Sequence, residues 1–229
     1  MKKLAQHIRN FAYQTGKDNK QVLDDLLTYI IGAFNPERQP DPTWKYTKEQ
    51  NGEFFSMMQE YFLVMQKELT HLEWFDAWGD LFMALTPKGG SKGQFFTPVS
   101  LCNLLADVTD KPMEAEAVCN GFGKRVTVCD PAAGSSRNLL AAHATFIKNN
   151  REKPYLIAED VDAMCCKMSA INMMVHGCYG EVICHDTLGE PKNVRIGYIV
   201  NEGMYPLQPG FPTIRIKTEP EYFVCTRRG

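Results

Sequence analysis

The chain has 229 residues, of which 44% are hydrophobic and 23% are charged. This composition favours a soluble globular protein, either one domain with an appendage or two small domains. The formal net charge of −2 excludes a strong overall attraction to nucleic acid, while a local basic face stays compatible with it.

Cysteine usage and hydropathy indicate an intracellular protein. Eight cysteines are present without a paired C-x-x-C spacing, so we expect reduced thiols rather than disulfides or a zinc site, and no metal. The sequence shows no signal peptide and no long apolar span. We therefore expect a cytoplasmic protein that does not enter a membrane.

The first part of the chain, residues 1–88, is expected to be a helical domain. Apolar residues recur at helical spacing close to the N-terminus and, more strongly, over residues 22–31. After a proline-rich break, the same spacing returns over residues 53–69 and 72–85. Packing on a neighbouring domain explains the aromatic and methionine residues here better than a cofactor role does.

A flexible connector, TPKGGSKG at residues 86–93, precedes a further helix. Thr97 stands where an N-cap is expected, and Pro98 suits the first turn of a helix over residues 99–108. Residues 111–124 are expected to form a loop that leads into the central strand.

The stretch VTVCDPAAGSSRNLL, residues 126–140, predicts a strand, a tight turn and a helix. Pro131 cannot extend the strand, Gly134 permits a positive φ, and Ser135 or Ser136 can cap the helix that follows. Backbone N–H groups and the positive end of the helix dipole then face the carboxyl edge of a sheet. Open α/β sheets bind nucleotide-like ligands at that edge.

The residues of this turn limit the ligand. A phosphate loop has a lysine after its last glycine, and a dinucleotide loop spaces three glycines as G-x-G-x-x-G, but this turn has neither. Asp130 at the strand end would repel a pyrophosphate and can attract an amino-acid ammonium. On this stretch alone, an ordinary strand-to-helix turn is an equally good interpretation.

Strands and helices alternate after the turn. Strands are expected over residues 155–158, 181–184 and 195–200. A helix over residues 163–176 separates the first two, and this alternation predicts a parallel sheet with right-handed crossovers. Two short strands, 213–217 and 222–225, are expected to form a hairpin at the sheet edge.

Asp130, Asp160 and Asp186 each follow one of three successive expected strands. Because such strand ends converge on one cleft, we expect the three carboxylates to lie together. The second can accept two ribose hydroxyls, the third can accept from an adenine amino group, and the first can meet a cationic amino acid. Together they predict a site for an adenosine joined to an amino acid, although any single one is more often a loop residue or a helix cap.

Five motifs, in this order, resemble those of the N6-adenine DNA methyltransferases, and most closely the methylation subunits of type I restriction-modification systems. They are GQFFTP (93–98), DPAAGSS (130–136), AEDVD (158–162), INMMVHG (171–177) and HDTL (185–188). The resemblance covers roughly residues 1–200. It implies an α/β fold in which the helical domain precedes a Rossmann-like S-adenosyl-L-methionine-dependent methyltransferase domain, residues 89–229, shortened at its C-terminus.

The resemblance also implies cofactor-binding residues. The methionine end of the cofactor is expected to be lined by Gln94, Phe95, Phe96, Thr97 and Pro98. The turn that cradles it is expected to consist of Asp130, Pro131, Ala132 and Gly134. Asp160 is expected to hold the ribose hydroxyls, in preference to Glu159 because of its spacing to Asn172, and Asp186 to face the adenine ring.

Two departures from the family pattern stand out. The family reads D-P-A-C-G-S-G, and Ser136 here replaces the last glycine, which requires a helical φ at that position. The catalytic motif is normally Asn-Pro-Pro followed by Phe or Tyr, whereas the corresponding residues here are Asn201-Glu-Gly-Met-Tyr205. By position, Asn201 is expected to orient the target amino group and Tyr205 to stack on the flipped base. Cofactor binding thus carries over better than catalysis.

Three functions follow from these patterns. The favoured one is methyl transfer to adenine N6 in DNA, with a specificity or partner subunit supplying target recognition. The alternative is a catalytically degenerate cofactor-binding module that acts as a regulator or partner subunit. The third, methylation of a small molecule or a protein, is disfavoured only by GQFFTP and the order of the motifs.

Overall fold

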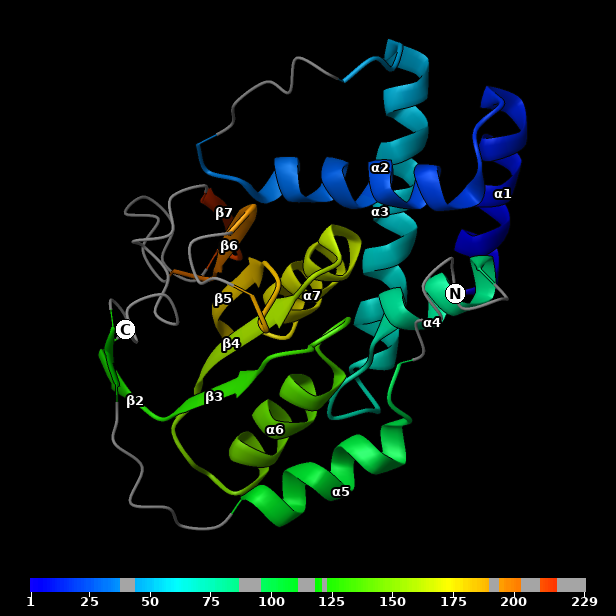
Figure 1. Ribbon diagram of the computed structural model, residues 1–229. Helices are drawn as coiled ribbons and strands as arrows, with labels where there is room; N and C mark the ends of the chain where they lie inside the picture. Colours follow the sequence, from blue (N-terminus) through cyan, green and yellow to red (C-terminus); the bar gives the residue numbers. More distant parts are fainter. Residues whose placement is uncertain are drawn as a thin grey trace.

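The structure is a computed structural model that describes residues 1–37, 44–86, 96–110, 118–120, 123–189, 194–202 and 211–217. Helices gather on one side of the molecule and the sheet lies on the other (Figure 1). Gln94, Phe95, Tyr205, the expected strand 222–225 and the expected domain boundary at residues 88 and 89 all lie outside the described residues.

The predicted N-terminal helices are confirmed. They are α1 (Lys2–Thr15), α2 (Asn19–Phe34), α3 (Lys48–Glu68) and α4 (Ala77–Leu85). Local signals fix their ends: Gly16 closes α1 in a left-handed conformation, and the Asp18 side chain caps α2. A reciprocal capping box between Thr47 and Gln50 begins α3.

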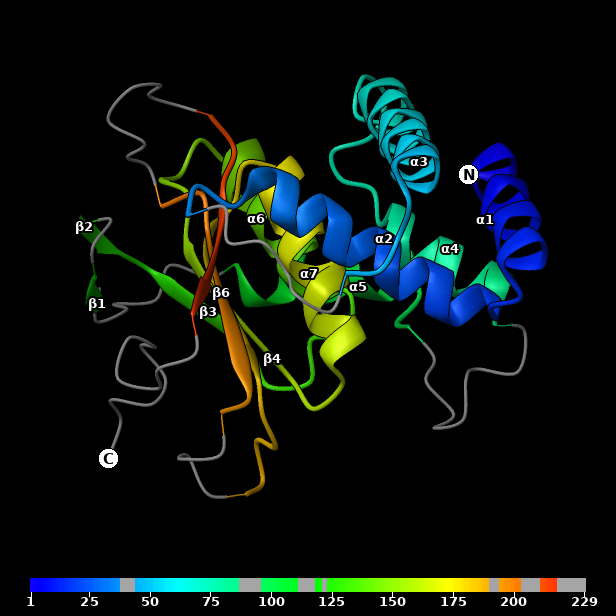
Figure 2. The ribbon, with the colours of Figure 1, turned by 90° about the horizontal axis from the view of Figure 1, so that it is seen from above.

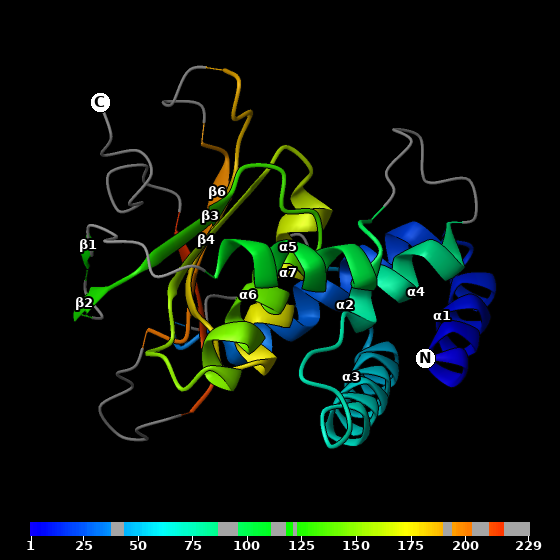
Figure 3. The ribbon, with the colours of Figure 1, turned by 90° about the horizontal axis from the view of Figure 1, so that it is seen from below.

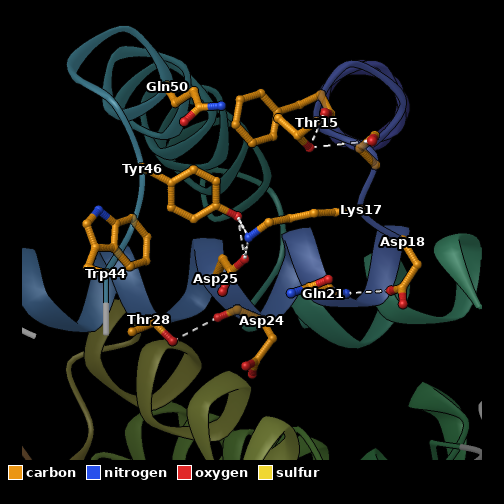
Figure 4. A network of polar contacts seen from close by, with 12 residues as sticks. Thr15, Lys17, Asp18, Gln21, Asp24, Asp25, Thr28, Trp44, Tyr46 and Gln50 are labelled. Atoms are coloured by element: carbon orange, nitrogen blue, oxygen red, sulfur yellow. Dashed lines mark hydrogen bonds and ion pairs between the residues drawn. The ribbon is translucent and has the colours of Figure 1, made fainter. Parts of the chain in front are cut away.

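A polar network joins the first three helices across their connections (Figure 4). Lys17, which follows α1, lies 3.0 Å from the Asp25 carboxylate of α2. Tyr46, which precedes α3, donates its hydroxyl hydrogen bond to the same carboxylate. Burial and this contact raise the pKa of Tyr46 to about 12, so the phenol stays protonated and keeps donating. The network therefore holds the ends of α1 and α3 against α2.

The sheet has the order β3-β4-β5-β6-β7. Its strands are β3 (Thr127–Asp130), β4 (Tyr155–Asp160), β5 (Tyr179–Cys184), β6 (Ile196–Val200) and β7 (Ile214–Lys217). The first three are parallel, as predicted, and are connected by α6 (Arg137–Lys148) and α7 (Ala163–Val175). Figures 2 and 3 show these helices on one face of the sheet, with α2 lying against α7. One continuous hydrophobic core extends from α1 into α7.

The prediction of a parallel sheet is wrong for the strand expected over residues 195–200. β6 runs antiparallel to β5, so that Val200 pairs with Gly180, and β7 runs antiparallel to β6. A parallel neighbour needs a crossover of a dozen or more residues, usually with a helix, and the connection over residues 185–195 is shorter than that. The carboxyl end of β6 therefore lies beside the amino end of β5. The carboxyl ends of β3, β4 and β5 are at the other end of the strands.

One helix and two short strands come between α4 and β3. Helix α5 (Val99–Thr109) packs on α6 and begins after Pro98, so that Pro98 takes the N-cap position expected for Thr97. Within the expected loop 111–124, β1 (Val118–Asn120) and β2 (Gly123–Arg125) form a separate antiparallel hairpin.

Three features are absent from the described residues. None of their helices is long and apolar enough to cross a membrane. The six cysteines whose side chains are described form no disulfide. Within the same ranges, no group of three or more His, Cys, Asp or Glu residues is placed to hold a metal ion.

Candidate functional site

The turn between β3 and α6 is fastened to the carboxyl end of β4. The Gly134 N–H donates to Oδ2 of Asp160 at 2.9 Å, and the Ala133 N–H donates to the Glu159 carbonyl at 2.9 Å. Gly134 has φ +56°, a conformation that glycine adopts without strain. Oδ1 of Asp160 accepts from the Asp162 N–H at 2.8 Å. Asp160 thus shapes the turn, and each of its oxygens retains a second lone pair.

Asp130 lies at the start of the same turn and is half-buried. Its Oδ1 accepts from the Ala132 N–H at 3.1 Å, and its Oδ2 accepts from the Asn138 side-chain amide at 3.1 Å. These two contacts hold the carboxylate beside the first turn of α6. Pro131 and Ala132 are exposed at the rim.

Ser136 does not have the helical φ that its place in the motif required. It adopts a left-handed conformation, φ 73° and ψ 26°, at the N-cap of α6, and its hydroxyl makes no capping hydrogen bond. Its buried Oγ is instead bonded to Oγ of Ser169 on α7. The backbone here is the one that the glycine of the family pattern would adopt freely, so the side-chain contact offsets a local strain.

Phe96 and Thr97 cover the turn. A Cβ on Gly134 would lie 3.0 Å from the Phe96 ring, so the aromatic side chain packs directly on the glycine. Nη1 of Arg137 donates to the Thr97 carbonyl at 3.2 Å, and its guanidinium lies 5.5 Å from the centre of the Phe96 ring. These contacts hold the segment before α5 against the start of α6.

A hollow of about 140 Å³ opens between this cover and the turn. Its lining consists of Phe96, Thr97, Ala132, Ala133, Gly134, Arg137, Asn138, Asp160 and Cys165. Oδ1 of Asn138 is buried and has no hydrogen-bond partner among the described residues. Asn138 and the Asp160 carboxylate both line the hollow, and acceptors of this kind suit a cationic ligand with N–H donors.

Sequence reasoning missed Asp76, which ties the helical part to this site. Asp76 is buried at the N-cap of α4, where its Oδ1 accepts from the Gly79 N–H at 2.8 Å and from the Asn172 amide at 2.7 Å. Its Oδ2 accepts from Ser135 Oγ and from Arg137 Nε, both at 2.6 Å. The position of Asp76 before the helix could have predicted that it caps α4. Its bonds to Ser135, Arg137 and Asn172 could not be predicted from the sequence.

Asp186 and Glu159 lie near the hollow without lining it. Asp186 follows β5 at the same sheet edge as Asp130 and Asp160, is exposed, and accepts from the Leu188 N–H at 3.1 Å. Glu159 is buried and lies 3.1 Å from Nε2 of His185. Asp130, Asp160 and Asp186 thus lie at the carboxyl ends of neighbouring strands, as expected. Of these three, Asp160 lines the hollow.

Asn201 is not part of this site. It follows the antiparallel strand β6, at the far edge of the sheet, with φ 51°. Its buried amide donates to the carbonyls of Met174 and Cys178 at 3.1 and 2.8 Å and accepts from the Thr213 N–H at 3.1 Å. These hydrogen bonds join α7 and the residue before β5 to the residue before β7, and the catalytic role expected for Asn201 stays a prediction.

Each of three comparisons with known proteins gives a match. Residues 76–208 match the family described as N-6 DNA Methylase. The type I restriction enzyme MjaVII methylase subunit of Methanocaldococcus jannaschii is 24% identical over 125 residues, which are 52% of this chain and 20% of that subunit. A Listeria monocytogenes crystal structure, described as a class I S-adenosylmethionine-dependent methyltransferase, matches with a TM-score of 0.51 at 14% identity.

These matches show the fold of the chain and how much of each relative's length it covers. The Listeria structure is matched over 82% of this chain and 54% of its own, and this likeness confirms the Rossmann-like α/β fold expected from the motifs. The chain spans about a fifth of the methylase subunit and about half of the Listeria protein.

Proposed function

The chain belongs to the N-6 DNA methylase family, and from this premise we propose that it binds S-adenosyl-L-methionine beside Gly134 and transfers its methyl group to N6 of adenine in DNA. The observation that carries the proposal is the turn that Asp160 clamps through the Gly134 N–H, above a hollow lined by hydrogen-bond acceptors. A site of this charge suits an amino acid with a free ammonium better than a pyrophosphate.

Residues in and around the hollow have separate chemical tasks in this proposal. Asp130 and the unpartnered Oδ1 of Asn138 receive the ammonium of the methionine part. Asp160 accepts the ribose hydroxyls with its remaining lone pairs, and Asp186 accepts from the adenine amino group. Phe96, Thr97 and Pro98 are assigned to the methionine end, as are Gln94 and Phe95, which lie outside the described residues.

The bound cofactor supplies an electrophilic methyl group on its sulfonium. The contribution of the chain is then to bind and orient the two reactants, because no covalent enzyme intermediate is needed. Phe96, packed on Gly134 and held by Arg137, limits the access of water to the hollow. We propose that a specificity or partner subunit recognises the DNA sequence. We also propose that the protein acts in the cytoplasm.

A second function, cofactor binding without turnover, has one observation in its favour. The residue expected to hold the target amino group, Asn201, lies at the opposite sheet edge with its amide fully bonded. In that case the chain acts as a regulator or as one part of a larger methyltransferase.

Methylation of an adenine-rich duplex with tritium-labelled cofactor separates the two functions. The proposal predicts label in N6-methyladenine, with or without an added partner subunit. Calorimetric binding of the cofactor, together with no label under either condition, identifies a binding module instead.

A further inference from the structure

We propose that Arg137 binds the carboxylate of the cofactor's methionine part, and that this carboxylate replaces Asp80 on the guanidinium. The proposal rests on the proposed function, because it names the ligand group that Arg137 meets when S-adenosyl-L-methionine enters the hollow. Arg137 then distinguishes the amino-acid form of the cofactor from analogues that lack a carboxylate.

The amino-acid part of the cofactor carries two opposite charges, and the hollow has to accommodate both. The buried Oδ1 of Asn138 and the Asp160 carboxylate offer acceptors for the ammonium, and both residues line the hollow. The same acceptors repel a carboxylate. Of the described residues that line the hollow, Arg137 is the one with a positive charge. A ligand carboxylate in the hollow is therefore stabilised best beside this guanidinium.

The guanidinium of Arg137 is held at the hollow through each of its three nitrogen atoms. Nε donates to Asp76 at 2.6 Å, Nη1 donates to the Thr97 carbonyl at 3.2 Å, and Nη2 donates to Asp80 at 2.7 Å. A guanidinium has five N–H donors, so these bonds leave one on Nη1 and one on Nη2 for a ligand. Because the side chain is already fixed and only 11% exposed, binding a carboxylate needs little further ordering.

The two carboxylates that pair with Arg137 are held very differently. The Asp76 side chain is 1% exposed, and it also accepts from the Ser135 hydroxyl and the Asn172 amide. The Asp80 side chain is 51% exposed, and an ion pair in contact with water contributes little net stabilisation. Asp76 is therefore a fixed part of the site, whereas Asp80 is the partner that a ligand carboxylate can replace.

The balance of charge favours this exchange. Asp76 and Asp80 together place two carboxylates around one guanidinium. Partial burial raises the pKa of Asp80, and the charge of Asp76 adds to the increase, although Arg137 acts in the opposite direction. A ligand carboxylate that entered while Asp80 stayed in place would add a third negative charge. Replacement of Asp80 avoids this repulsion.

A purely structural role for Arg137 is the alternative. Its contacts with Asp76, Thr97 and the Phe96 ring would then only fasten the turn and its cover. In that case the loss of Arg137 would affect every ligand of the hollow equally. Decarboxylated S-adenosylmethionine distinguishes the two roles, because it keeps the adenosine, the sulfonium and the amine and lacks only the carboxylate.

The test is isothermal titration of the 229-residue chain with the intact and the decarboxylated cofactor. Arg137→Gln should weaken binding of the intact cofactor about tenfold or more, because a charge-assisted contact is lost. Binding of the decarboxylated cofactor should change much less. Arg151→Gln is the matched control, because Arg151 is also an ion-paired arginine, bonded to Asp110 outside this hollow, and both affinities should stay unchanged.

Asp80→Asn tests the exchange while Arg137 stays in place, so the proposal remains testable if thermal unfolding shows that Arg137→Gln is not folded. We expect about threefold tighter binding of the intact cofactor, because a competing charge is removed, and no gain for the decarboxylated one. Asp24→Asn is the matched control. Asp24 pairs with Lys167 of another helix at 2.8 Å and is 37% exposed, and its loss should change neither affinity.

The results for the two ligands decide between the roles. Equal weakening of both ligands by Arg137→Gln overturns the proposal in favour of a structural role. Asp80→Asn overturns it as well if the intact cofactor binds no more tightly, or if both ligands gain equally. Failure of both ligands to bind the folded wild-type chain would instead contradict the proposed function, and this proposal with it.

Discussion

The buried carboxylate of Asp76 lies 2.6 Å from Nε of Arg137, and this ion pair joins the start of α4 to the start of α6. Arg137 also reaches Asp80 at 2.7 Å and the Thr97 carbonyl at 3.2 Å. One guanidinium therefore connects the helical part, the segment that covers the turn, and the hollow itself. The helical part is in this way a structural component of the candidate site.

Removal of Asp76 should strongly destabilise the protein. Asp76→Ala removes the buried carboxylate that accepts from Arg137, Ser135 and Asn172, and the expected loss in the free energy of unfolding is about 3–5 kcal/mol. The matched control is Glu73→Gln, because Glu73 pairs with Lys148 of α6 across the same junction but with both side chains about 60% exposed. That change should cost less than about 1 kcal/mol. Denaturant unfolding measures both, and equal losses would contradict the assigned role of Asp76.

A methyl group at Gly134 should block the hollow. Gly134→Ala places a Cβ 3.0 Å from the Phe96 ring and forces alanine into φ +56°. We expect a loss of about 1 kcal/mol in stability and at least tenfold weaker cofactor binding. Gly52→Ala is the control, because its Cβ meets nothing within 4 Å in α3, and it should stabilise the helix by up to about 1 kcal/mol. Calorimetry and thermal unfolding measure both effects.

The left-handed Ser136 predicts an unusual response to glycine. Ser136→Gly relieves a backbone strain of about 1 kcal/mol but removes the hydrogen bond to Ser169. We expect the free energy of unfolding to change little, whereas Ser136→Ala keeps the strain, loses the bond, and should be clearly less stable. A glycine variant as unstable as the alanine variant would show that the side-chain bond outweighs the backbone strain.

Asn201 should behave as a structural residue. Asn201→Ala removes three hydrogen bonds in a buried setting and places alanine at φ 51°, so we expect a loss of about 2–4 kcal/mol. Cofactor affinity of the folded fraction should be unchanged, since the residue lies at the other sheet edge. A variant with wild-type stability that has lost methyl transfer would favour the catalytic role for Asn201.

Stability should fall on acidification because of a buried histidine. Burial lowers the pKa of His143 on α6 from 6.5 to about 4, with smaller contributions from Lys153 and His176. The neutral form is the one that the fold accepts, so this contribution is complete above pH 6.5 and is lost as pH falls from 6.5 to 4. The free energy of unfolding should therefore be about 3 kcal/mol lower at pH 4 than above pH 6.5. His143→Leu should lose correspondingly less stability between pH 7 and pH 4, and an unchanged pH profile would count against it.

Local sequence signals predicted most of the elements. Apolar periodicity located the N-terminal helices, and β-favouring runs located β3, β4 and β5. The meeting of Asp130, Asp160 and Asp186 at one sheet edge followed from a general rule on parallel strands and needed no knowledge of distant contacts. Their individual roles toward a cofactor stay predictions.

Other features depend on contacts that the sequence does not display. The residues of β6 alternate in the same way whether the strand is parallel or antiparallel, so its direction, and with it the place of Asn201, was not readable. The partners of Asp76 lie 59 to 96 positions away in the chain. The left-handed conformation of Ser136 is stabilised by Ser169, which is also distant in sequence.

The central claim is that the hollow beside Gly134 binds S-adenosyl-L-methionine. Isothermal titration of the folded chain with this cofactor, and with its demethylated product, tests the claim most directly. We expect saturable binding by the wild type that Gly134→Ala abolishes or weakens at least tenfold while Gly52→Ala does not. Absence of binding by both ligands to the folded wild-type protein, or equal binding by Gly134→Ala, would contradict it.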